Sequence, residues 1–338
     1  MKTNSLLVKI TNNKDLSSLE ARFIFKHIIS GKLSDIEKAG FLIALATKGE
    51  SINEIFEAAK ILRQKSKKIN AGINILDTCG TGGDGKDTLN ISTATAILAS
   101  ACGIKVAKHG NRAVSSKSGS SDVLTKLGVN INAKKTVVKK CLNNAGICFL
   151  MAPLYHSAMK NIANVRSILK IKTIFNILGP LLNPANANMQ LIGVYKSSLL
   201  EPVAQCIKKL GIKRAWIVCG EDGIDEITTS GETKVIEIKN NKLRYFKIMP
   251  ERLGLNKIKL NKIRGKTSKY NANEILKLFK NKNYNRSFRE IVLLNTAACL
   301  VISNHVKTLK QGIKIADNNL LNGNALKQLN KLKLLSNE

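Results

Sequence analysis

The chain has 338 residues, of which 44% are hydrophobic, a composition that supports a sizeable core and argues against wholesale disorder. Lys and Arg number 55 against 23 Asp and Glu, which gives a formal net charge of +32 at pH 7 and suggests anionic partners. Its apolar runs fall short of the roughly 18–20 residues that span a bilayer. Residues 1–20 also lack the apolar stretch of a signal peptide, so we expect neither a membrane protein nor a secreted one.

The basic excess consists of 45 Lys and 10 Arg, and residues 234–338 hold 23 basic against 6 acidic residues, a net charge of +17. Many Lys residues together with abundant Ile and Asn are typical of A/T-rich coding, whereas Arg is the residue that most often reads bases and phosphates. We therefore interpret the excess mainly as a solvated surface, with a functional basic surface as the alternative. Nucleic acid, if it binds at all, is expected to bind non-specifically.

Seven cysteines occur without the paired spacing of a metal site and without a neighbouring histidine cluster. Their odd number and irregular spacing indicate reduced, mostly buried thiols, the usual state in the cytoplasm. The sequence therefore predicts a cytoplasmic protein in which the cysteines are packing residues.

Residues 1–70 predict helices only. Apolar residues recur at intervals of three and four, and Ser18, Ser34 and Ser51 are candidate N-caps. The predicted helices span residues 19–30, 34–47 and 51–65. We expect residues 1–70 to form a small all-helical domain that is completed by part of 165–190.

Beyond Gly72, short apolar runs alternate with helical stretches, a pattern that favours an α/β fold with a mostly parallel central sheet over residues 71–338. The predicted strands span 73–76, 104–107, 147–151, 191–195 and 215–219. The predicted helices span 92–102, 121–127, 136–144, 156–169 and 198–210, with Gly103, Gly128, Gly146 and Gly211 at their ends. Residues 234–239 and 242–247 predict a hairpin, and the rest, to residue 335, is mostly helical.

The segment Asp77–Gly85 is unusually rich in glycine and follows the first predicted strand. Its glycines fit the dinucleotide fingerprint, and Gly80, Gly85 and Lys86 nearly fit a P-loop. The first match lacks a ribose-binding acid about 20 residues further on. In the second match, Asp87 stands where a metal-binding Ser or Thr is required, so neither motif is retained.

A site for phosphate and sugar is the physical interpretation of this loop. Closely spaced glycines let backbone N–H groups converge on an anion, and residues 90–93 begin the next helix at its positive end. The carboxylate of Asp84 would oppose a bare phosphate, but it can accept hydrogen bonds from sugar hydroxyls. A tight glycine-rich turn without a ligand is the alternative.

A second loop, residues 108–121, follows the next predicted strand. It combines cations, one histidine and several hydroxyl groups at the carboxyl end of a strand, where α/β sheets bind ligands. A solvated loop is the plain alternative. Beside the first loop, however, this composition indicates the other half of a phosphate site.

Four separated motifs make the sequence resemble the anthranilate phosphoribosyltransferase family, in order and with similar spacing. They are residues 77–85 with 90–93, residues 108–120, residues 152–184 and residues 223–226. The resemblance implies a small helical domain, a larger phosphoribosyl-binding α/β domain with the active site between them, and a homodimer formed through the helical domain. It also implies transfer of the phosphoribosyl group of phosphoribosyl pyrophosphate to the amine of anthranilate, in tryptophan biosynthesis, with Mg2+ as cofactor.

By motif position, the resemblance implies a donor site in the two loops. The residues implied to bind phosphoribosyl pyrophosphate are Gly80, Gly83, Asp84, Thr88, Asn90, Ile91, Ser92, Thr93, Lys108, His109, Gly110, Asn111, Arg112, Ala113, Val114, Ser115, Ser116 and Ser120. The implied ligands of Mg2+ are Ser92, Asp225 and Glu226.

The resemblance also implies an acceptor site. The implied contacts of anthranilate are Gly80, Asn111 and Arg166, and the implied tunnel residues are His109, His156, Gly179 and Pro180. Without the resemblance, Arg166 would be interpreted as a solvated helix residue; with it, the guanidinium is a planar partner for the anthranilate carboxylate. Because the aromatic amine is neutral at pH 7, we expect the two histidines to shape the tunnel rather than to transfer protons.

The sequence departs from the family pattern at five positions. Ser157 and Asn164 stand where Pro is usual, Lys170 and Lys172 where Gly and Arg are common, and Cys219 where His is common. We expect these changes to affect loop stiffness and acceptor affinity rather than the reaction.

Two other functions remain open. A pyrimidine nucleoside phosphorylase would share the architecture and a similar glycine-rich loop, but it would not need Arg166 or the Gly179-Pro180 segment. A nucleic-acid-binding paralogue is favoured by the net charge. It would be expected to lose Arg166, Asp225 or Glu226, and aromatic residues that could stack on bases make up only 4% of the chain.

Overall fold

The computed structural model describes residues 2–113 and 117–338. Val114, Ser115 and Ser116, three of the predicted donor-binding residues, lie outside the described residues. The chain begins with the helices α1 (Thr3–Thr11), α2 (Ser18–Ser30), α3 (Asp35–Lys48) and α4 (Ile52–Lys65), so the prediction of helices before residue 70 is confirmed.

Three of these helices begin with a capping box. The hydroxyls of Ser17, Ser34 and Ser51 each accept a hydrogen bond from the backbone three residues later, and a Glu side chain returns the contact. The prediction of Ser18 as a cap is wrong by one residue, because Ser17 has the extended backbone of a cap and Ser18 is already helical.

In the described residues, seven strands form one sheet in the order β3-β2-β1-β4-β5-β6-β7. The strands are β1 (Leu76–Gly80), β2 (Val106–Gly110), β3 (Ile147–Met151), β4 (Met189–Gly193), β5 (Arg214–Gly220), β6 (Thr233–Lys239) and β7 (Lys242–Ile248). Strands β1 to β5 pair in parallel, and β6 and β7 add an antiparallel hairpin. Asn240 and Asn241, both at positive φ, form its two-residue turn. The predicted α/β fold with a mostly parallel sheet is therefore confirmed.

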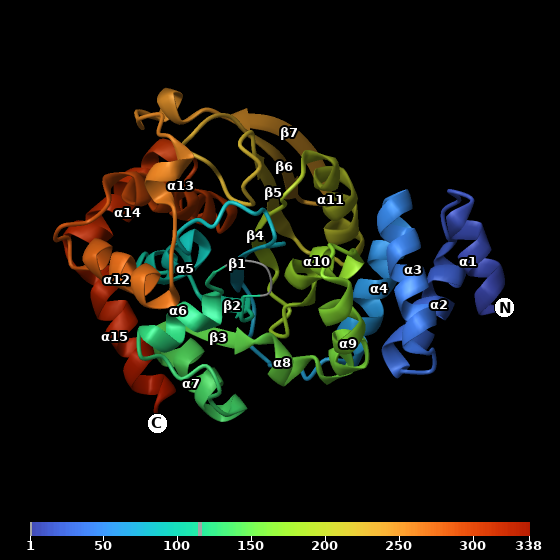
Figure 1. Ribbon diagram of the computed structural model, residues 1–338. Helices are drawn as coiled ribbons and strands as arrows, with labels where there is room; N and C mark the ends of the chain where they lie inside the picture. Colours follow the sequence, from blue (N-terminus) through green and yellow to red (C-terminus); the bar gives the residue numbers. More distant parts are fainter. Residues whose placement is uncertain (1, 114–116) are drawn as a thin grey trace.

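The helices that follow residue 90 cover both faces of this sheet (Figure 1). They are α5 (Ile91–Ala101), α6 (Ser120–Lys126), α7 (Lys135–Ala145), α8 (Ala152–Tyr155), α9 (Lys160–Leu169), α10 (Ile174–Leu178), α11 (Leu200–Lys209), α12 (Ser268–Phe279), α13 (Arg286–Ile302), α14 (Leu309–Leu321) and α15 (Asn324–Ser336). Short 3-10 turns include η1 (Ser157–Met159), η2 (Gly179–Leu182), η3 (Ser197–Leu199), η4 (Pro250–Leu253) and η5 (Leu260–Ile263). Among the described residues, no helix has the length and apolar character that crossing a membrane requires.

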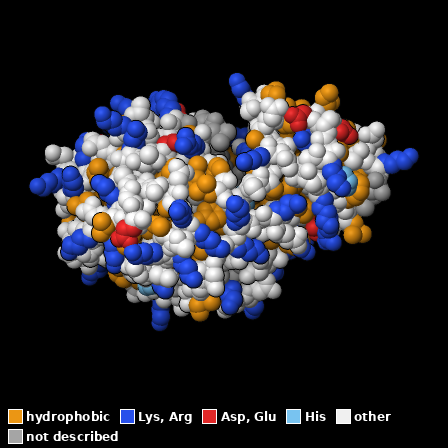
Figure 2. Space-filling view, turned by 90° about the horizontal axis from the view of Figure 1, so that it is seen from below, with side chains coloured by type: hydrophobic (Ala, Val, Ile, Leu, Met, Phe, Trp, Pro, Cys, Tyr) orange, Lys and Arg blue, Asp and Glu red, His pale blue; other side chains and the backbone are white. Residues whose placement is uncertain are grey.

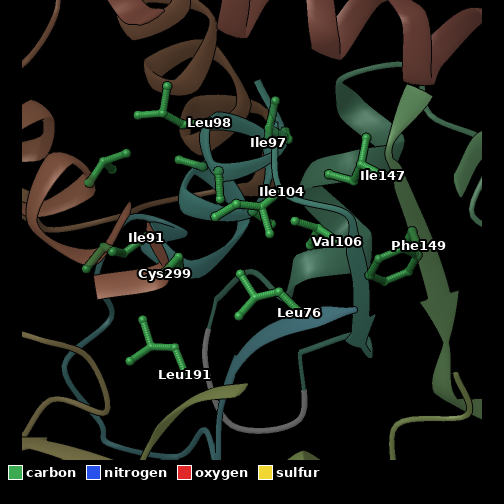
Figure 3. Close-up of a cluster of buried hydrophobic side chains, with 14 of the residues drawn as sticks. Leu76, Ile91, Ile97, Leu98, Ile104, Val106, Ile147, Phe149, Leu191 and Cys299 are labelled. Carbon is green, nitrogen blue, oxygen red and sulfur yellow. The ribbon is translucent and has the colours of Figure 1, made fainter. Parts of the chain in front are cut away.

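The sheet separates two hydrophobic cores, because successive side chains of a strand point to opposite faces. In β5, Trp216 and Val218 join the core beneath α5, α7 and α13, whereas Ile217 and Cys219 join the core that contains the N-terminal helices. Figure 3 shows the first core, in which side chains of β1, β2 and β3 meet those of α5 and Cys299 of α13.

The N-terminal helices do not pack alone. Helix α9 contacts α2 and α3, α10 contacts α4, and α11 lies between α4 and the sheet (Figure 1). These contacts support the division into residues 1–70, completed by part of 165–190, and residues 71–338, which we keep as a proposal.

Several predicted boundaries of strands and helices are wrong. Strand β1 begins at Leu76 rather than residue 73, because Ile73 is 80% exposed and Asn74 has a positive φ. Strands β1 and β2 continue into polar residues that the apolar pattern excludes. The predicted helix 156–169 begins later than expected: buried His156 is not helical, η1 follows it, and α9 starts at Lys160.

Candidate functional site

An open α/β sheet is expected to have its ligand crevice at the carboxyl ends of β1 and β4, where the chain order of the strands reverses direction across the sheet. Such a switch point is the usual ligand site of an open α/β sheet. The last pair of residues there is Gly80 and Gly193. A side chain at Gly80 would meet Asp225 Oδ2 at 2.0 Å, and one at Gly193 would meet the Asp225 carbonyl oxygen at 1.5 Å. Both glycines therefore make room for Asp225.

Asp225 and Glu226 are held in this crevice by backbone donors. Asp225 Oδ2 accepts a hydrogen bond of 2.7 Å from the N–H of Gly82, and Glu226 Oε1 accepts one of 3.1 Å from the N–H of Ser92. Burial, followed by the negative charge of Asp84, raises the pKa of Asp225 to about 6. Burial and the charge of Asp225 raise the pKa of Glu226 well above its usual value. The crevice thus concentrates negative charge that a cation would stabilise.

The glycine-rich loop wraps around these carboxylates. Gly82, Gly83 and Gly85 all have φ near +70°, a conformation that residues with side chains rarely adopt. Within the loop, Asp84 Oδ1 accepts a hydrogen bond of 3.1 Å from the N–H of Lys86, and burial raises the pKa of Asp84. Half-buried Asp84 faces the same crevice as Asp225, which fits its predicted contact with a ligand.

Lys108 joins the two predicted loops. It lies in β2, is 3% exposed, and its Nζ donates to the Thr78 carbonyl oxygen at 2.6 Å and to Ser92 Oγ at 3.2 Å. Its positive charge also lowers the pKa of Glu226, against the effect of burial. A buried ammonium beside a helix start and a carboxylate is suited to hold a phosphate.

The second loop folds back onto the start of α6. Asp122 Oδ2 accepts hydrogen bonds from the N–H groups of Ala113 and Gly119, at 3.0 and 2.9 Å. Asn111 and Arg112 are exposed, and Asn111 Oδ1 accepts a hydrogen bond of 2.8 Å from the N–H of Arg112. A side chain at Gly110 would meet Ser120 Oγ at 2.2 Å, which explains the glycine.

Some predicted donor residues offer only their backbone. The side chain of Ile91 lies in the first core, and Thr93 is 1% exposed on the same helix. Thr88 pairs with Arg264 through an antiparallel bridge. Direct contacts bring together Gly80, Ser92, Lys108, Asp225 and Glu226. Separately, Ser120 Oγ donates to the Asn111 carbonyl oxygen at 3.4 Å in the second loop.

A second group forms around the two predicted tunnel histidines. The rings of His109 and His156 meet edge to face at 5.2 Å, and His109 Nδ1 lies 3.3 Å from the Gly179 carbonyl oxygen. Because a carbonyl can only accept, we assign the proton of a neutral His109 ring to Nδ1. Burial lowers the pKa of His109 to about 3 and that of His156 to about 4, so both rings are neutral at pH 7.

Arg166 lies on α9, half-buried, with its guanidinium carbon 5.7 Å from the centre of the Phe175 ring. Burial lowers its pKa, and no charged partner among the described residues opposes that effect. Phe175 belongs to α10, which leads directly into Gly179 and Pro180 of η2. The guanidinium has no carboxylate partner in the described part of the chain and lies beside an aromatic ring. It therefore suits a ligand that carries both a carboxylate and an aromatic ring. The described contacts do not join Arg166 to Asn111, the other predicted acceptor residue.

Three further residues lie around these groups but are not among the predicted site residues. Asp77 is fully buried in β1, and its Oδ1 accepts a hydrogen bond of 3.1 Å from the N–H of His109. Lys172 Nζ lies 3.8 Å from the centre of the Tyr195 ring, and its charge lowers the pKa of Asp84. Asn271 lies 1% exposed against Asn90. Of the three, only Asp77 could have been recognised from the sequence, as a carboxylate that directly follows an apolar strand run.

The predicted metal residues fit a cation that binds together with a ligand. Within the described residues, no three His, Cys, Asp or Glu side chains form a metal site by themselves. Mg2+ commonly takes one or two carboxylates and completes its shell with phosphate oxygens and water. Burial, and after it the neighbouring carboxylates, raises the pKa values of Asp225 and Glu226, and a bound cation would favour their ionised forms.

Comparison with known proteins first defines the class. A model described as "Glycosyl transferase family, helical bundle domain" matches residues 4–66, and one described as "Glycosyl transferase family, a/b domain" matches residues 72–326. The chain therefore belongs to a glycosyltransferase family.

More closely related proteins narrow this class. The anthranilate phosphoribosyltransferase of Clostridium kluyveri is 46% identical over 323 residues, which cover 95% of this chain and 96% of that protein. The Thermus thermophilus enzyme superposes with a TM-score of 0.91 at 34% identity, covering 98% of this chain and 99% of that one. The Saccharomyces cerevisiae enzyme in complex with PRPP and Mg has a TM-score of 0.89 at 29% identity and covers 98% of each chain. The chain belongs to the anthranilate phosphoribosyltransferase family.

Proposed function

We propose that this protein transfers the phosphoribosyl group of phosphoribosyl pyrophosphate to the amine of anthranilate, giving N-(5'-phosphoribosyl)anthranilate and pyrophosphate. The observation that carries the proposal is the cluster at the carboxyl ends of β1 and β4, where Glu226 and Lys108 both contact Ser92 at the start of α5 and Asp225 lies against Gly80 and Gly193. This combination of an ammonium group, carboxylates and a helix start suits a sugar that carries several phosphates.

The donor is proposed to bind between the two loops. Lys108 and the first turn of α5 would hold phosphate oxygens, and Asp84 would accept hydrogen bonds from the ribose hydroxyls. Asn111 and Arg112 are exposed on the second loop and would approach the donor from the other side. The yeast relative is described with PRPP and Mg, which supports this choice of ligand.

Displacement at the anomeric carbon releases a highly charged pyrophosphate. Asp225 and Glu226, together with the Ser92 hydroxyl, would hold Mg2+, which when bound supplies positive charge to the phosphate oxygens. Lys108 contributes a second positive charge, which the hydrogen bonds from its Nζ to the Thr78 carbonyl oxygen and to Ser92 Oγ hold in place.

The acceptor is proposed to lie between Arg166 and the histidine pair. Arg166 would bind the anthranilate carboxylate, while the neutral rings of His109 and His156 would form the apolar wall. Neither histidine is needed as a strong base, because an aromatic amine is neutral at pH 7. Alignment of the amine with the anomeric carbon is then the main contribution of this wall to the rate.

A cytoplasmic homodimer is the proposed form of the enzyme. Large apolar side chains are exposed on α1, α3 and α9, namely Val8, Ile36, Ile43 and Ile168. These helices contact one another, so the side chains are candidates for one apolar surface that a second copy would cover.

A steady-state assay with anthranilate, phosphoribosyl pyrophosphate and Mg2+ tests the proposal. We expect formation of pyrophosphate and of the phosphoribosylated amine that depends on all three components. Thymidine with inorganic phosphate is the matched assay for a pyrimidine nucleoside phosphorylase. Turnover in that assay, without turnover of anthranilate, would contradict the proposed function.

A further inference from the structure

The side-chain amide of Asn90 is held from both ends by residues that are distant in the sequence. Asn90 Nδ2 donates to the carbonyl oxygen of Ser118 at 3.1 Å, and Asn90 Oδ1 accepts from Asn271 Nδ2 at 2.8 Å. Asn271 lies in α12 and is 1% exposed, and its own Oδ1 accepts from the N–H of Lys266 at 2.9 Å. These contacts tie both predicted donor loops to the C-terminal part of the chain.

The direction of every hydrogen bond in this series is fixed by its two ends. The N–H of Lys266 can only donate, so Asn271 must turn its side-chain oxygen toward Lys266. The NH2 group of Asn271 then points to Asn90. Asn90 must then turn its oxygen to Asn271 and its NH2 group to Ser118, whose carbonyl can only accept. Neither amide can rotate by half a turn without breaking two hydrogen bonds.

This orientation keeps Asn90 from its usual role at the start of a helix. Asn90 is the N-cap of α5, where an Asn oxygen commonly accepts from the second or third N–H of the helix, yet it makes no such bond. The N–H of Ser92 donates instead to Glu226. The N–H of Thr93 has no partner among the described residues, and it remains open to an anion.

A short segment between η5 and α12 holds Asn271 against the first loop. The N–H of Leu89 donates to the carbonyl oxygen of Ile263 at 2.9 Å, and the N–H of Gly265 donates to that of Asp87 at 2.6 Å. A side chain at Gly265 would meet the Thr88 carbonyl oxygen at 2.5 Å and Asn271 Nδ2 at 3.0 Å. The segment therefore packs so closely against the first loop that a side chain at residue 265 would not fit between them.

We infer that Asn271 is a positioning residue for donor binding. It holds the Asn90 amide away from the first turn of α5, so that the N–H of Thr93 stays available to a phosphate of the donor. Through Asn90 and Ser118 it also sets the second loop relative to the first. The inference rests on the proposed function and adds to it a residue that does not itself touch the donor.

Asn271→Ala tests this role in the full-length enzyme. The freed Asn90 side chain can then cap its own helix, and we expect the donor KM to rise about tenfold, as for one lost hydrogen bond with a buried partner. The KM for anthranilate at saturating donor should stay within about twofold. Asn271→Asp keeps an acceptor for Lys266 but cannot donate to Asn90, so it should also raise the donor KM if the alanine variant folds poorly.

Asn324→Ala is the matched control. It removes another amide-to-amide hydrogen bond, of 2.9 Å to Asn319, from a pair in α14 and α15, and it should leave both KM values unchanged. In an Asn90→Ala background, Asn271→Ala should have no further effect on the donor KM. Wild-type turnover with an unchanged donor KM in both Asn271 variants, or additive effects in the double variant, would overturn the inference. Absence of wild-type turnover would instead reject the proposed function.

Discussion

At the scale of single residues, Arg166 is the group most directly tied to the choice of acceptor. Its guanidinium is half-buried against Phe175 without a charged partner in the described part of the chain. Arg166→Ala should raise the anthranilate KM by roughly 30- to 150-fold, because a charge-assisted bidentate contact is worth about 2–3 kcal/mol. Arg166→Lys should restore only part of this affinity, since an ammonium lacks the planar fork.

The control for Arg166 is Lys160→Ala, which removes an exposed cation from the same helix. This variant should leave both KM values unchanged. An anthranilate KM that does not change in Arg166→Ala would remove the residue from the acceptor site.

Asp225 and Glu226 are expected to act on turnover rather than on folding. Asp225→Asn combined with Glu226→Gln keeps oxygen acceptors for the N–H groups of Gly82 and Ser92 but removes the charges proposed to hold Mg2+. We expect kcat to fall on the order of a hundredfold or more, as when other electrostatic stabilisers are lost. Thermal stability should change little or rise, because repulsion between buried like charges is relieved.

Asp222→Asn is the control in the same turn, where the carboxylate contacts Thr228 and the N–H of Ile224. It should leave the Mg2+ requirement unaltered. Higher Mg2+ should restore part of the activity of the double variant. Near-normal turnover with an unchanged Mg2+ requirement would exclude the pair from the mechanism.

The lowered pKa values of the two buried histidines predict that the protein loses stability in acid. The pKa of His156 is lowered from 6.5 to about 4 in the folded protein, so the unfolded chain binds the proton more readily below about pH 6.5. The free energy of unfolding should therefore fall as the pH drops from about 6.5 toward about 4, by about 2 kcal/mol between pH 7.5 and pH 5 for this residue.

Urea unfolding at the two pH values measures the effect. In His156→Gln, the fall in the free energy of unfolding between pH 7.5 and pH 5 should be smaller than in wild type by about 2 kcal/mol. In His305→Gln, which changes an exposed residue, the fall should equal that of wild type. An equal acid loss in wild type and His156→Gln would show that other groups cause it.

At the scale of elements, the ends of β1 and β4 decide whether the crevice forms. Gly193→Ala would place its methyl group 1.5 Å from the Asp225 carbonyl oxygen, a backbone atom that cannot move aside locally. We expect loss of several kcal/mol of stability together with loss of activity, since the strand end or the turn must shift.

Gly40→Ala is the matched control for this substitution. Its methyl group would lie 3.7 Å from Leu7 Cδ2 inside α3, an ordinary contact. It should raise stability by about 0.5–1 kcal/mol, because alanine favours a helix interior over glycine. Thermal unfolding of both variants measures the contrast, and a fully stable, active Gly193→Ala would contradict the described seat of Asp225.

The elements also show where prediction from sequence succeeds. Helices with a strong apolar period and a capping box, such as α3, are predicted to within a residue or so. The end of strand β2 that carries Lys108 and His109 is missed, because both side chains contact carbonyl oxygens far away in the sequence, those of Thr78 and Gly179. The late start of α9 is also missed, because His156, whose ring packs against that of His109, does not adopt a helical backbone.

At the scale of the whole molecule, the sequence predicts two units but not how they share their packing. One hydrophobic core contains both the N-terminal helices and one face of β4, β5 and β6. Alternation along β5 assigns its side chains to the two cores, and periodicity alone does not reveal which helices cover each face. The motifs locate the two donor loops, whereas the contacts of Asn271 and Lys172 are seen only in the folded chain.

The net charge is also a property of the whole molecule. In the face that Figure 2 presents, Lys and Arg side chains are spread over both lobes, with few acidic side chains among them. A dispersed excess of Lys provides a general attraction for anions. It does not provide the clustered Arg and aromatic groups that read bases or stack on them.

Binding to duplex DNA should therefore depend on counterion release alone. We expect measurable binding at about 20 mM salt, a fall of at least tenfold by about 150 mM, and no preference among DNA sequences of equal length. Fluorescence anisotropy with a labelled duplex, titrated at several salt concentrations, measures the slope, and an unlabelled duplex of different sequence serves as competitor. The small anionic substrates gain from the same field, so their KM values should also rise with salt, though less steeply because they carry fewer charges. A sub-micromolar Kd that persists at about 150 mM salt would instead require a specific nucleic-acid-binding surface. Residues 234–338, with their net charge of +17, would then be the first candidates for that surface.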